Sequence, residues 1–291
     1  MGAIVRGSNH VGASQVKPAL ARRGRERHDA PVNDSESDVI FEVRGVVKRF
    51  DEHTVLDRVD LSLRRGETVS IIGPSGCGKT VLLKCMIGLM PIDAGEIFFC
   101  GLPMSTMSDT QRLDLRRRVG LMFQYNALFD SMTVAENVAY GLHERLSHPM
   151  TDAEIEERVT WALACVGMAG TEALRPEEMS GGMRKRIGLA RTMALRPEVI
   201  LYDEPTMGLD PINTHRIGEL IEGLHKAYSI SALMVTHDMK LAAHVSSRMV
   251  MLHEGRVLGH GTPDEMAAHA DIRIRDFITG TARDDDGQSI T

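Results

Sequence analysis

Residues 73–80 read Gly73-Pro74-Ser75-Gly76-Cys77-Gly78-Lys79-Thr80. This octapeptide matches the pattern G-x-x-x-x-G-K-[ST], in which glycines let main-chain N–H groups wrap closely around phosphate oxygens. It follows an apolar stretch from Glu67 to Ile72 and precedes a helical pattern, which is the strand-to-helix context that the pattern requires. We predict that the loop binds the phosphates of a nucleotide.

Individual residues of the loop have separate predicted tasks. The helix that starts at Lys79 turns the positive end of its dipole toward the phosphates. We expect Lys79 to reach the β and γ phosphates and Thr80 to offer its hydroxyl to Mg²⁺, which takes few protein ligands. We interpret Cys77 as a small space-filling residue rather than a catalytic thiol, because no activating base stands near it in the sequence.

The sequence around the loop predicts an α/β fold with a parallel sheet, because strand-like and helical patterns alternate. A strand-rich beginning and a helical block from Met132 to Pro176 predict two additional lobes, with the helical lobe at about 125–190. A capping box, Thr151-Asp152-Ala153-Glu154, opens one of the helices. The expected strands are 39–46, 55–63, 67–72, 96–100, 199–202 and 231–235, and the expected helices begin at 79, 151, 184 and 211.

Composition limits the classes of function. The net charge of -6 does not favour nucleic acid as a partner, and the 4 cysteines lack the spacing of a zinc site or a disulfide framework. No run approaches the roughly 18 apolar residues of a spanning helix, so a membrane role would pass through another subunit. We predict that residues 1–38 form a mobile arm, which is either a solvated tail or a basic segment that touches anionic lipid or a partner. We predict that residues 281–291 form a loose tail.

Two acids follow a short apolar strand at residues 199–202. Asp203 stands where nucleotide-binding enzymes of this loop type place a magnesium ligand. Glu204 would point differently and could activate a water molecule as a general base. An acidic pair at a strand end is often only a solvated turn. The phosphate-binding loop makes the catalytic interpretation the stronger one.

A second phosphate-binding pattern, Ser180-Gly181-Gly182, precedes a long helical stretch. Such residues commonly serve only as a helix N-cap. A helix N-terminus is also an anion site, yet one chain needs only one nucleotide site. We predict that this segment completes the nucleotide site of a second copy of the chain, in a head-to-tail homodimer.

Taken together, these motifs resemble the nucleotide-binding subunit of ABC transporters from about Val39 to Gly261, and we assign residues 39–280 to that domain. The resemblance implies an ATP hydrolase with a parallel-sheet core, an antiparallel β lobe and a helical lobe, and with ATP and Mg²⁺ as ligands. It implies that Phe50 stacks on adenine, that Gln124 senses magnesium and contacts a membrane subunit, and that His237 contacts the γ phosphate. Without the resemblance, Phe50 could be a core residue and Gln124 a loop residue. Residues 208–210 would cross to the partner copy.

One residue departs from the family pattern. Met183 stands where most members have glutamine after the two glycines, so a side-chain hydrogen bond is lost while the main-chain donors persist. This methionine, and the ending from Ile272 to Gly280, are similar to the ATPases of the Mla and Mce systems, which move phospholipids or other lipids between bacterial membranes.

That resemblance implies several partners and a location. The partners are integral membrane permease subunits, a lipid-binding Mce-type protein and a small regulatory subunit, with no nucleic acid. The location is the cytoplasmic face of the bacterial inner membrane. Three alternatives remain open from the sequence: an ATPase that regulates a membrane complex, as cell-division proteins of this type do, an importer ATPase for another substrate, and a soluble protein of translation or DNA repair.

Overall fold

The computed structural model describes residues 38–124, 127–145, 149–283 and 289–290, and the statements below concern these residues. They belong to one compact unit that spans 37–291. Of the N-terminal arm predicted for 1–38, only Asp38 is among the described residues, so the mobility of the arm stays a prediction.

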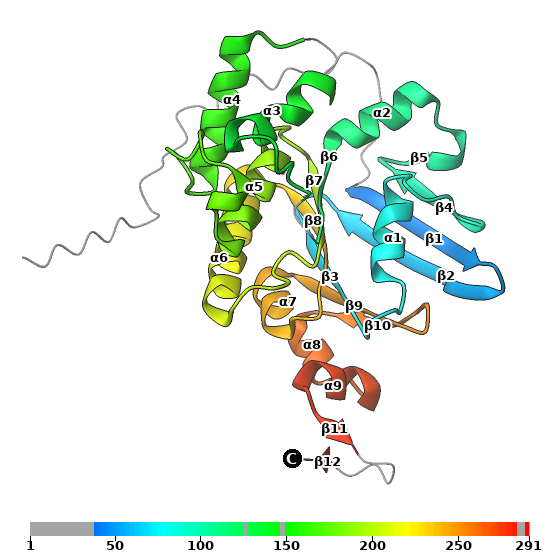
Figure 1. Ribbon diagram of the computed structural model, residues 1–291. Helices are drawn as coiled ribbons and strands as arrows, with labels where there is room; N and C mark the ends of the chain where they lie inside the picture. The colour runs from blue at the N-terminus through cyan, green and yellow to red at the C-terminus, as the bar shows by residue number, and fades with distance from the viewer. Residues whose placement is uncertain (1–37, 125–126, 146–148, 284–288, 291) are drawn as a thin grey trace, which may run out of the picture. The chain divides into compact units, whose positions relative to one another are not determined.

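The central sheet has the strand order β10-β9-β3-β8-β7-β6, and all of its strands run parallel except β10 (Figure 1). Strands β3, β7 and β8 are buried along their whole length, as expected for parallel strands that are covered on both faces. Their carboxyl ends meet at one edge, where ligands bind in sheets of this kind. The strands are β3 (Thr68–Ile72), β6 (Val119–Met122), β7 (Val199–Asp203), β8 (Ser231–Val235), β9 (Arg248–His253) and β10 (Arg256–Gly261).

A second, antiparallel sheet has the order β2-β1-β4-β5. Apolar side chains from both sheets and from α1 form one hydrophobic cluster, which includes Phe41, Leu63, Val69 and Leu82. This packing fixes the first sheet against the phosphate-loop strand β3 and helix α1. The strands are β1 (Val39–Phe50), β2 (His53–Arg64), β4 (Ala94–Phe99) and β5 (Leu102–Pro103).

Helices on the opposite side of the central sheet build a second cluster. Helix α5 packs against α3, α4 and strand β6, and these helices form the helical lobe at the top left of Figure 1. The predicted capping box is present, because Glu154 N–H donates to Thr151 Oγ1 and Thr151 N–H donates to the Glu154 carboxylate. The helices of the chain up to β8 are α1 (Lys79–Met86), α2 (Asp109–Arg118), α3 (Val134–Arg145), α4 (Asp152–Cys165), α5 (Gly181–Met193) and α6 (Pro211–Tyr228), with short 3-10 turns at Met104–Thr106 and Pro176–Glu178.

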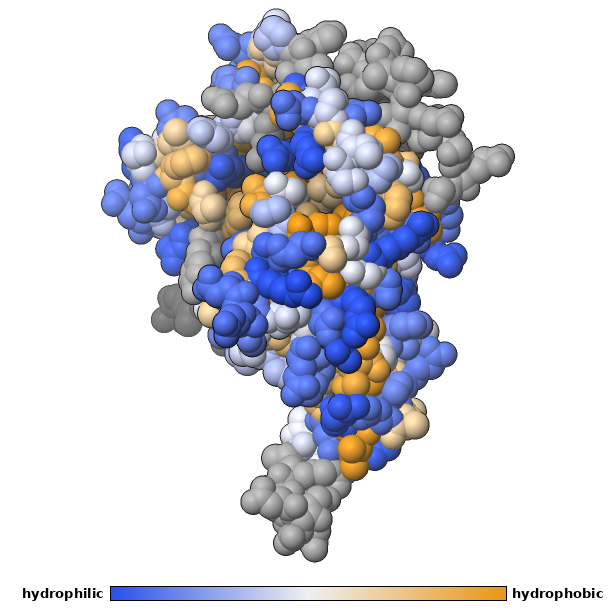
Figure 2. Space-filling model, turned by 90° about the vertical axis from the view of Figure 1, so that its right-hand side faces the viewer, coloured by the Kyte–Doolittle hydropathy of each residue, from blue (hydrophilic) through white to orange (hydrophobic). Residues whose placement is uncertain are grey.

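The C-terminal part adds α7 (Met239–Val245), α8 (Pro263–Ala267) and α9 (Ile272–Thr279). Ile274 of α9 is fully buried with Met249 and Met251 of β9 in a third cluster. On the side of the molecule shown in Figure 2, hydrophobic residues come to the surface in small groups between hydrophilic ones. Among the described residues, none of the helices combines the length and the apolar character of a membrane-spanning segment.

In the closing segment, which is predicted to be a loose tail over 281–291, the structure describes two short strands. Ala282–Arg283 (β11) pairs antiparallel with Ser289–Ile290 (β12), while 284–288 and 291 lie outside the described residues. A pairing of two residues on each side needs no periodic pattern, so it could not be predicted from the sequence, and the looseness of the tail stays a prediction. The α/β fold with a parallel sheet, an antiparallel sheet and a helical lobe is confirmed.

Candidate active site

The predicted phosphate-binding loop, residues 73–80, lies between β3 and α1. Neighbouring atoms leave no room for a side chain at two of its glycines. Gly73 has φ +143°, and a Cβ there would lie 2.0 Å from the main-chain oxygen of Leu252. Gly78 has φ +103°, and a Cβ there would lie 2.8 Å from the oxygen of Val55. Side chains do not fit at either position. The loop is therefore held tightly between β9 and the start of β2.

Lys79 folds into this loop. Its side chain is buried, and Nζ donates to the carbonyl oxygens of Gly73 at 2.7 Å and Pro74 at 2.8 Å. A buried ammonium needs such acceptors, because its transfer from water is otherwise costly. The positive charge of Lys79 and the positive end of the α1 dipole therefore lie at the same loop.

Cys77 is also buried in the loop, with its Sγ 3.8 Å from Lys79 Nζ. Burial raises the pKa of the Cys77 thiol, and the positive charge of Lys79 opposes that rise only in part. A thiol of raised pKa is a poor nucleophile, which agrees with its interpretation as a space-filling residue.

Thr80 and Asp203 come together at the ends of different elements. Thr80 Oγ1, in the first turn of α1, donates to Asp203 Oδ1 at 2.8 Å, and Asp203 is the last residue of β7. Hydroxyl and carboxylate oxygens are the protein ligands that Mg²⁺ prefers. This oxygen pair therefore fits the magnesium site that the sequence predicts.

Glu204 and His237 form a second pair beside it. Glu204 Oε2 lies 2.8 Å from His237 Nδ1, and the side chain of Glu204 is 13% exposed while that of His237 is 64% exposed. Glu204 has the unusual φ of +50°, and its N–H donates to the oxygen of Val235 at 2.9 Å. A mostly buried carboxylate next to an exposed imidazole is the arrangement expected of a general base and the group that orients it.

Gln124, predicted as a metal-sensing residue, makes other contacts in this structure. Its side-chain amide contacts Met207 Sδ, and its main-chain oxygen accepts a 2.6 Å hydrogen bond from Lys185 Nζ. Lys185 also donates to the main-chain oxygen of Glu204 at 3.5 Å. Burial lowers the pKa of Lys185, against the opposing effect of the negative charges of Glu204 and Asp203.

The remaining predicted residues lie on other elements. Ser180 is the N-cap of α5, and its Oγ accepts from the N–H of Met183 at 3.3 Å. The first N–H groups of a helix have no partner within the helix, so those of Gly181 and Gly182 are suited to an anion. Phe50, at the end of β1, is 43% exposed as a residue, and Lys48 Nζ lies 5.3 Å from the centroid of its ring.

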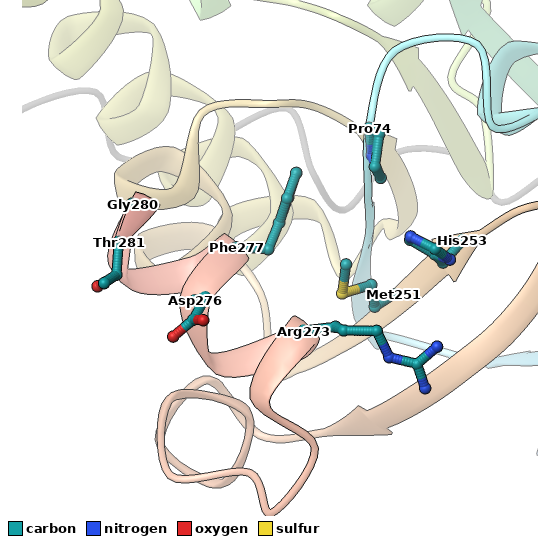
Figure 3. Close-up of a pocket in the computed structure, with 8 residues that line it drawn as sticks. All are labelled: Pro74, Met251, His253, Arg273, Asp276, Phe277, Gly280 and Thr281. Atoms are coloured by element: carbon teal, nitrogen blue, oxygen red, sulfur yellow. The ribbon is translucent and has the colours of Figure 1, made fainter. Parts of the chain in front are cut away.

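A cavity of about 400 Å³ lies on the outer side of the loop, at Pro74 (Figure 3). Helix α9 forms one wall, from which Phe277 projects into the cavity while Asp276 points away from it. Met251 and His253 of β9 and Arg273 form the rest of the wall. The cavity is separate from the Thr80–Asp203 and Glu204–His237 pairs, none of which lines it.

Residues 56–207 match the ABC transporter family. The chain belongs to this family. A solved ABC transporter cassette, MJ0796, superimposes with a TM-score of 0.71 at 28% identity, over 77% of this chain and 98% of the cassette. That structure is dimeric, and the same cassette has been solved in a post-hydrolysis state bound to ADP and Pi. This ABC transporter subunit is an ATP hydrolase that binds nucleotide.

Several relatives extend the similarity over most of the chain. TRIGALACTOSYLDIACYLGLYCEROL 3 of Arabidopsis thaliana is 38% identical over 85% of this chain and 76% of its own length. The intermembrane phospholipid transport ATP-binding protein MlaF of Escherichia coli K12 is 35% identical over 84% of this chain and 90% of its own length. The sulfate/thiosulfate import protein CysA of Bordetella pertussis is 40% identical over 78% of this chain and 63% of its own length. The resemblance of this ABC ATPase to the Mla type is thereby confirmed.

Sequence reasoning missed Lys185 and Met207. Lys185 occupies a position of the buried face of α5, together with Gly188, Leu189 and Thr192 at helical spacing. A lysine on an otherwise buried stripe is a signal that could have found it. Nothing in the sequence pattern marks Met207, which is 41% exposed.

Proposed function

We propose that this ATPase powers the movement of phospholipid or another lipid between membranes, in a transporter of the Mla or Mce type. The observation that carries the proposal is the 35% identity to MlaF over 90% of the length of MlaF. That similarity extends beyond residues 56–207, the part that matches the ABC family in general. The resemblance of Met183 and of the ending from Ile272 to Gly280 to the lipid-transport ATPases agrees with the proposal.

A second candidate substrate is sulfate or thiosulfate, which the identity of 40% to CysA favours. This chain covers only 63% of CysA but 90% of MlaF. The lipid substrate is the preferred proposal, because the similarity to MlaF covers 84% of this chain and the similarity to CysA covers 78%.

For nucleotide binding, we assign the phosphates to the loop 73–80 and to Lys79, whose Nζ already lies inside the loop at 2.7 Å from the oxygen of Gly73. Adenine would stack on the exposed ring of Phe50. Thr80 and Asp203 would hold Mg²⁺, with Gln124 as a further ligand once its side chain leaves Met207. Bound there, Mg²⁺ would neutralise the charge of the phosphate oxygens.

For hydrolysis, we assign the general base to Glu204. Its carboxylate is mostly buried and contacts the imidazole of His237, which keeps the carboxylate in one orientation. Glu204 would take a proton from a water molecule whose oxygen attacks the γ phosphorus, while the bond from that phosphorus to the β–γ bridging oxygen breaks and ADP leaves. His237 and Lys79 would stabilise the negative charge that spreads over the phosphoryl oxygens.

We further propose that two copies pair head to tail, and that Ser180-Gly181-Gly182 of each copy closes the site of the other. The dimeric state of MJ0796 supports this arrangement. Closure would act on integral membrane permease subunits near Gln124, at the cytoplasmic face of the bacterial inner membrane. A lipid-binding Mce-type protein and a small regulatory subunit would complete the assembly.

The test reconstitutes the chain with its cognate membrane subunits in vesicles, and follows both phosphate release and the ATP-dependent transfer of a fluorescent phospholipid to acceptor vesicles. Lipid transfer by the native chain, lost in Glu204→Gln while ATP binding persists, is the expected result. Accumulation of ³⁵S-sulfate without lipid transfer would favour the importer. ATP turnover with neither transport would favour a regulatory ATPase.

A further inference from the structure

Lys185 is a charged residue on the buried face of α5. Only 3% of the residue is exposed, and it lies five positions after Ser180, the N-cap of the same helix. Lysine is almost never this buried unless specific groups compensate its charge. The groups that compensate the charge of Lys185 indicate which parts of the chain it connects.

The ammonium of Lys185 reaches main-chain oxygens in two other segments. Nζ lies 2.6 Å from the oxygen of Gln124, in the segment after β6, and 3.5 Å from the oxygen of Glu204, directly after β7. A hydrogen bond from a charged donor is stronger than one between neutral groups. One side chain therefore ties α5 to the two segments that carry Gln124 and Glu204.

The main chain at Glu204 has an unusual conformation. Its φ of +50° is a strained conformation that residues with a side chain seldom adopt. The N–H of Glu204 is held by the oxygen of Val235 at 2.9 Å, and its carbonyl faces Lys185. This conformation directs the carboxylate to His237, 2.8 Å away. A change at the carbonyl would thus displace the carboxylate.

We propose that Lys185 is a positioning residue for ATP hydrolysis, which aligns Glu204 and Gln124 with the helix whose N-terminus carries Ser180. The inference rests on the roles proposed above for these residues. If Ser180 binds the nucleotide of the second copy, α5 moves when the dimer closes. Lys185 would then carry that movement to the Glu204 and the Gln124 of its own chain. Closure of the nucleotide site of the second copy and alignment of Glu204 in the chain's own site would then occur together.

The test compares Lys185→Met and Lys185→Arg in the complex with the membrane subunits. Methionine has a similar volume but leaves the main-chain oxygens of Gln124 and Glu204 without this donor, so the free energy of unfolding should fall modestly while the chain stays folded. We expect kcat for ATP to fall roughly 10- to 100-fold, as a small misplacement of a catalytic group does, while KM changes less than about twofold. Arginine keeps a buried donor and should restore most of kcat. Lys226→Met, at an exposed residue of α6, is the matched control and should leave kcat unchanged.

Two outcomes overturn the inference: a native kcat in Lys185→Met, or a loss of kcat that Lys185→Arg does not restore and that follows a lower free energy of unfolding. If Lys185→Met does not fold, Lys185→Gln takes its place under the same criteria. Glu204→Gln, measured in parallel, separates the two proposals. Normal turnover in Glu204→Gln rejects the proposed base, whereas its inactivity together with a fully active Lys185→Met rejects only the role of Lys185.

Discussion

Thr80 Oγ1 donates a 2.8 Å hydrogen bond to Asp203 Oδ1, which joins the first turn of α1 to the end of β7 across 123 residues of sequence. Both are oxygen groups of the kind that bind Mg²⁺. In the presence of the ion, the hydroxyl oxygen would turn its lone pair to the metal instead of its proton to the carboxylate.

Thr80→Val keeps the shape of the side chain and removes this oxygen. We expect the gain in ATP affinity that Mg²⁺ provides to fall, because one ligand of the ion is lost. Titration of a fluorescent ATP analogue with Mg²⁺ and with EDTA measures that gain. Thr279→Val, on α9, should leave it unchanged. An undiminished effect of Mg²⁺ in Thr80→Val would exclude Thr80 as a ligand.

Phe50→Ala should weaken ATP binding. The residue is 43% exposed with its ring available for stacking, and the stacking of a base on an aromatic ring contributes roughly 1 to 3 kcal/mol, about 5- to 150-fold in affinity. Phe50→Tyr should bind ATP as the native chain does. Leu113→Ala removes an apolar side chain of similar exposure, 41%, and is the control. If Phe50→Ala keeps native affinity, adenine lies elsewhere.

His225 predicts a pH dependence of stability. It is buried between Tyr202 and Thr68, and burial lowers its pKa from 6.5 to about 4. Between these two values the unfolded chain binds a proton that the folded chain does not, so the free energy of unfolding falls as the pH is lowered from 6.5 toward 4. The full effect is at most about 3 kcal/mol.

Urea denaturation at pH 7.5 and at pH 5 measures this loss. His225→Gln should show a smaller difference between the two pH values, because it lacks the titrating group. His260→Gln, at an exposed histidine, should show the native difference. An equal difference in His225→Gln would assign the pH dependence to other groups.

Helix α9 offers a matched pair of isoleucines. Ile274 is fully buried, whereas Ile272 is 42% exposed. Ile274→Ala should lower the free energy of unfolding by about 2 to 5 kcal/mol, and Ile272→Ala by less than about 0.5 kcal/mol. Chemical denaturation of both variants tests the difference. Equal losses would mean that α9 does not pack on β9 in solution.

Local patterns explain which elements could be predicted. The loop at 73–80 and the capping box at Thr151 follow from short-range chemistry, and both have the expected geometry. Strands β6, β9 and β10 were not predicted, because their place in the sheet depends on pairing with residues far away in the sequence. Lys185 was missed for the same reason, since its partners Gln124 and Glu204 become its neighbours only in the folded chain.

The close approach of Gly73 to the main-chain oxygen of Leu252 excludes every other amino acid at position 73. Even alanine, whose methyl group would lie 2.0 Å from that oxygen, would force two strands of the sheet apart. Gly76 differs, because no described atom lies within 4 Å of its hypothetical Cβ and only its φ of +80° resists a side chain. A library randomised at both codons and selected for ATP turnover should therefore return glycine alone at the first, and glycine with some asparagine or aspartate at the second.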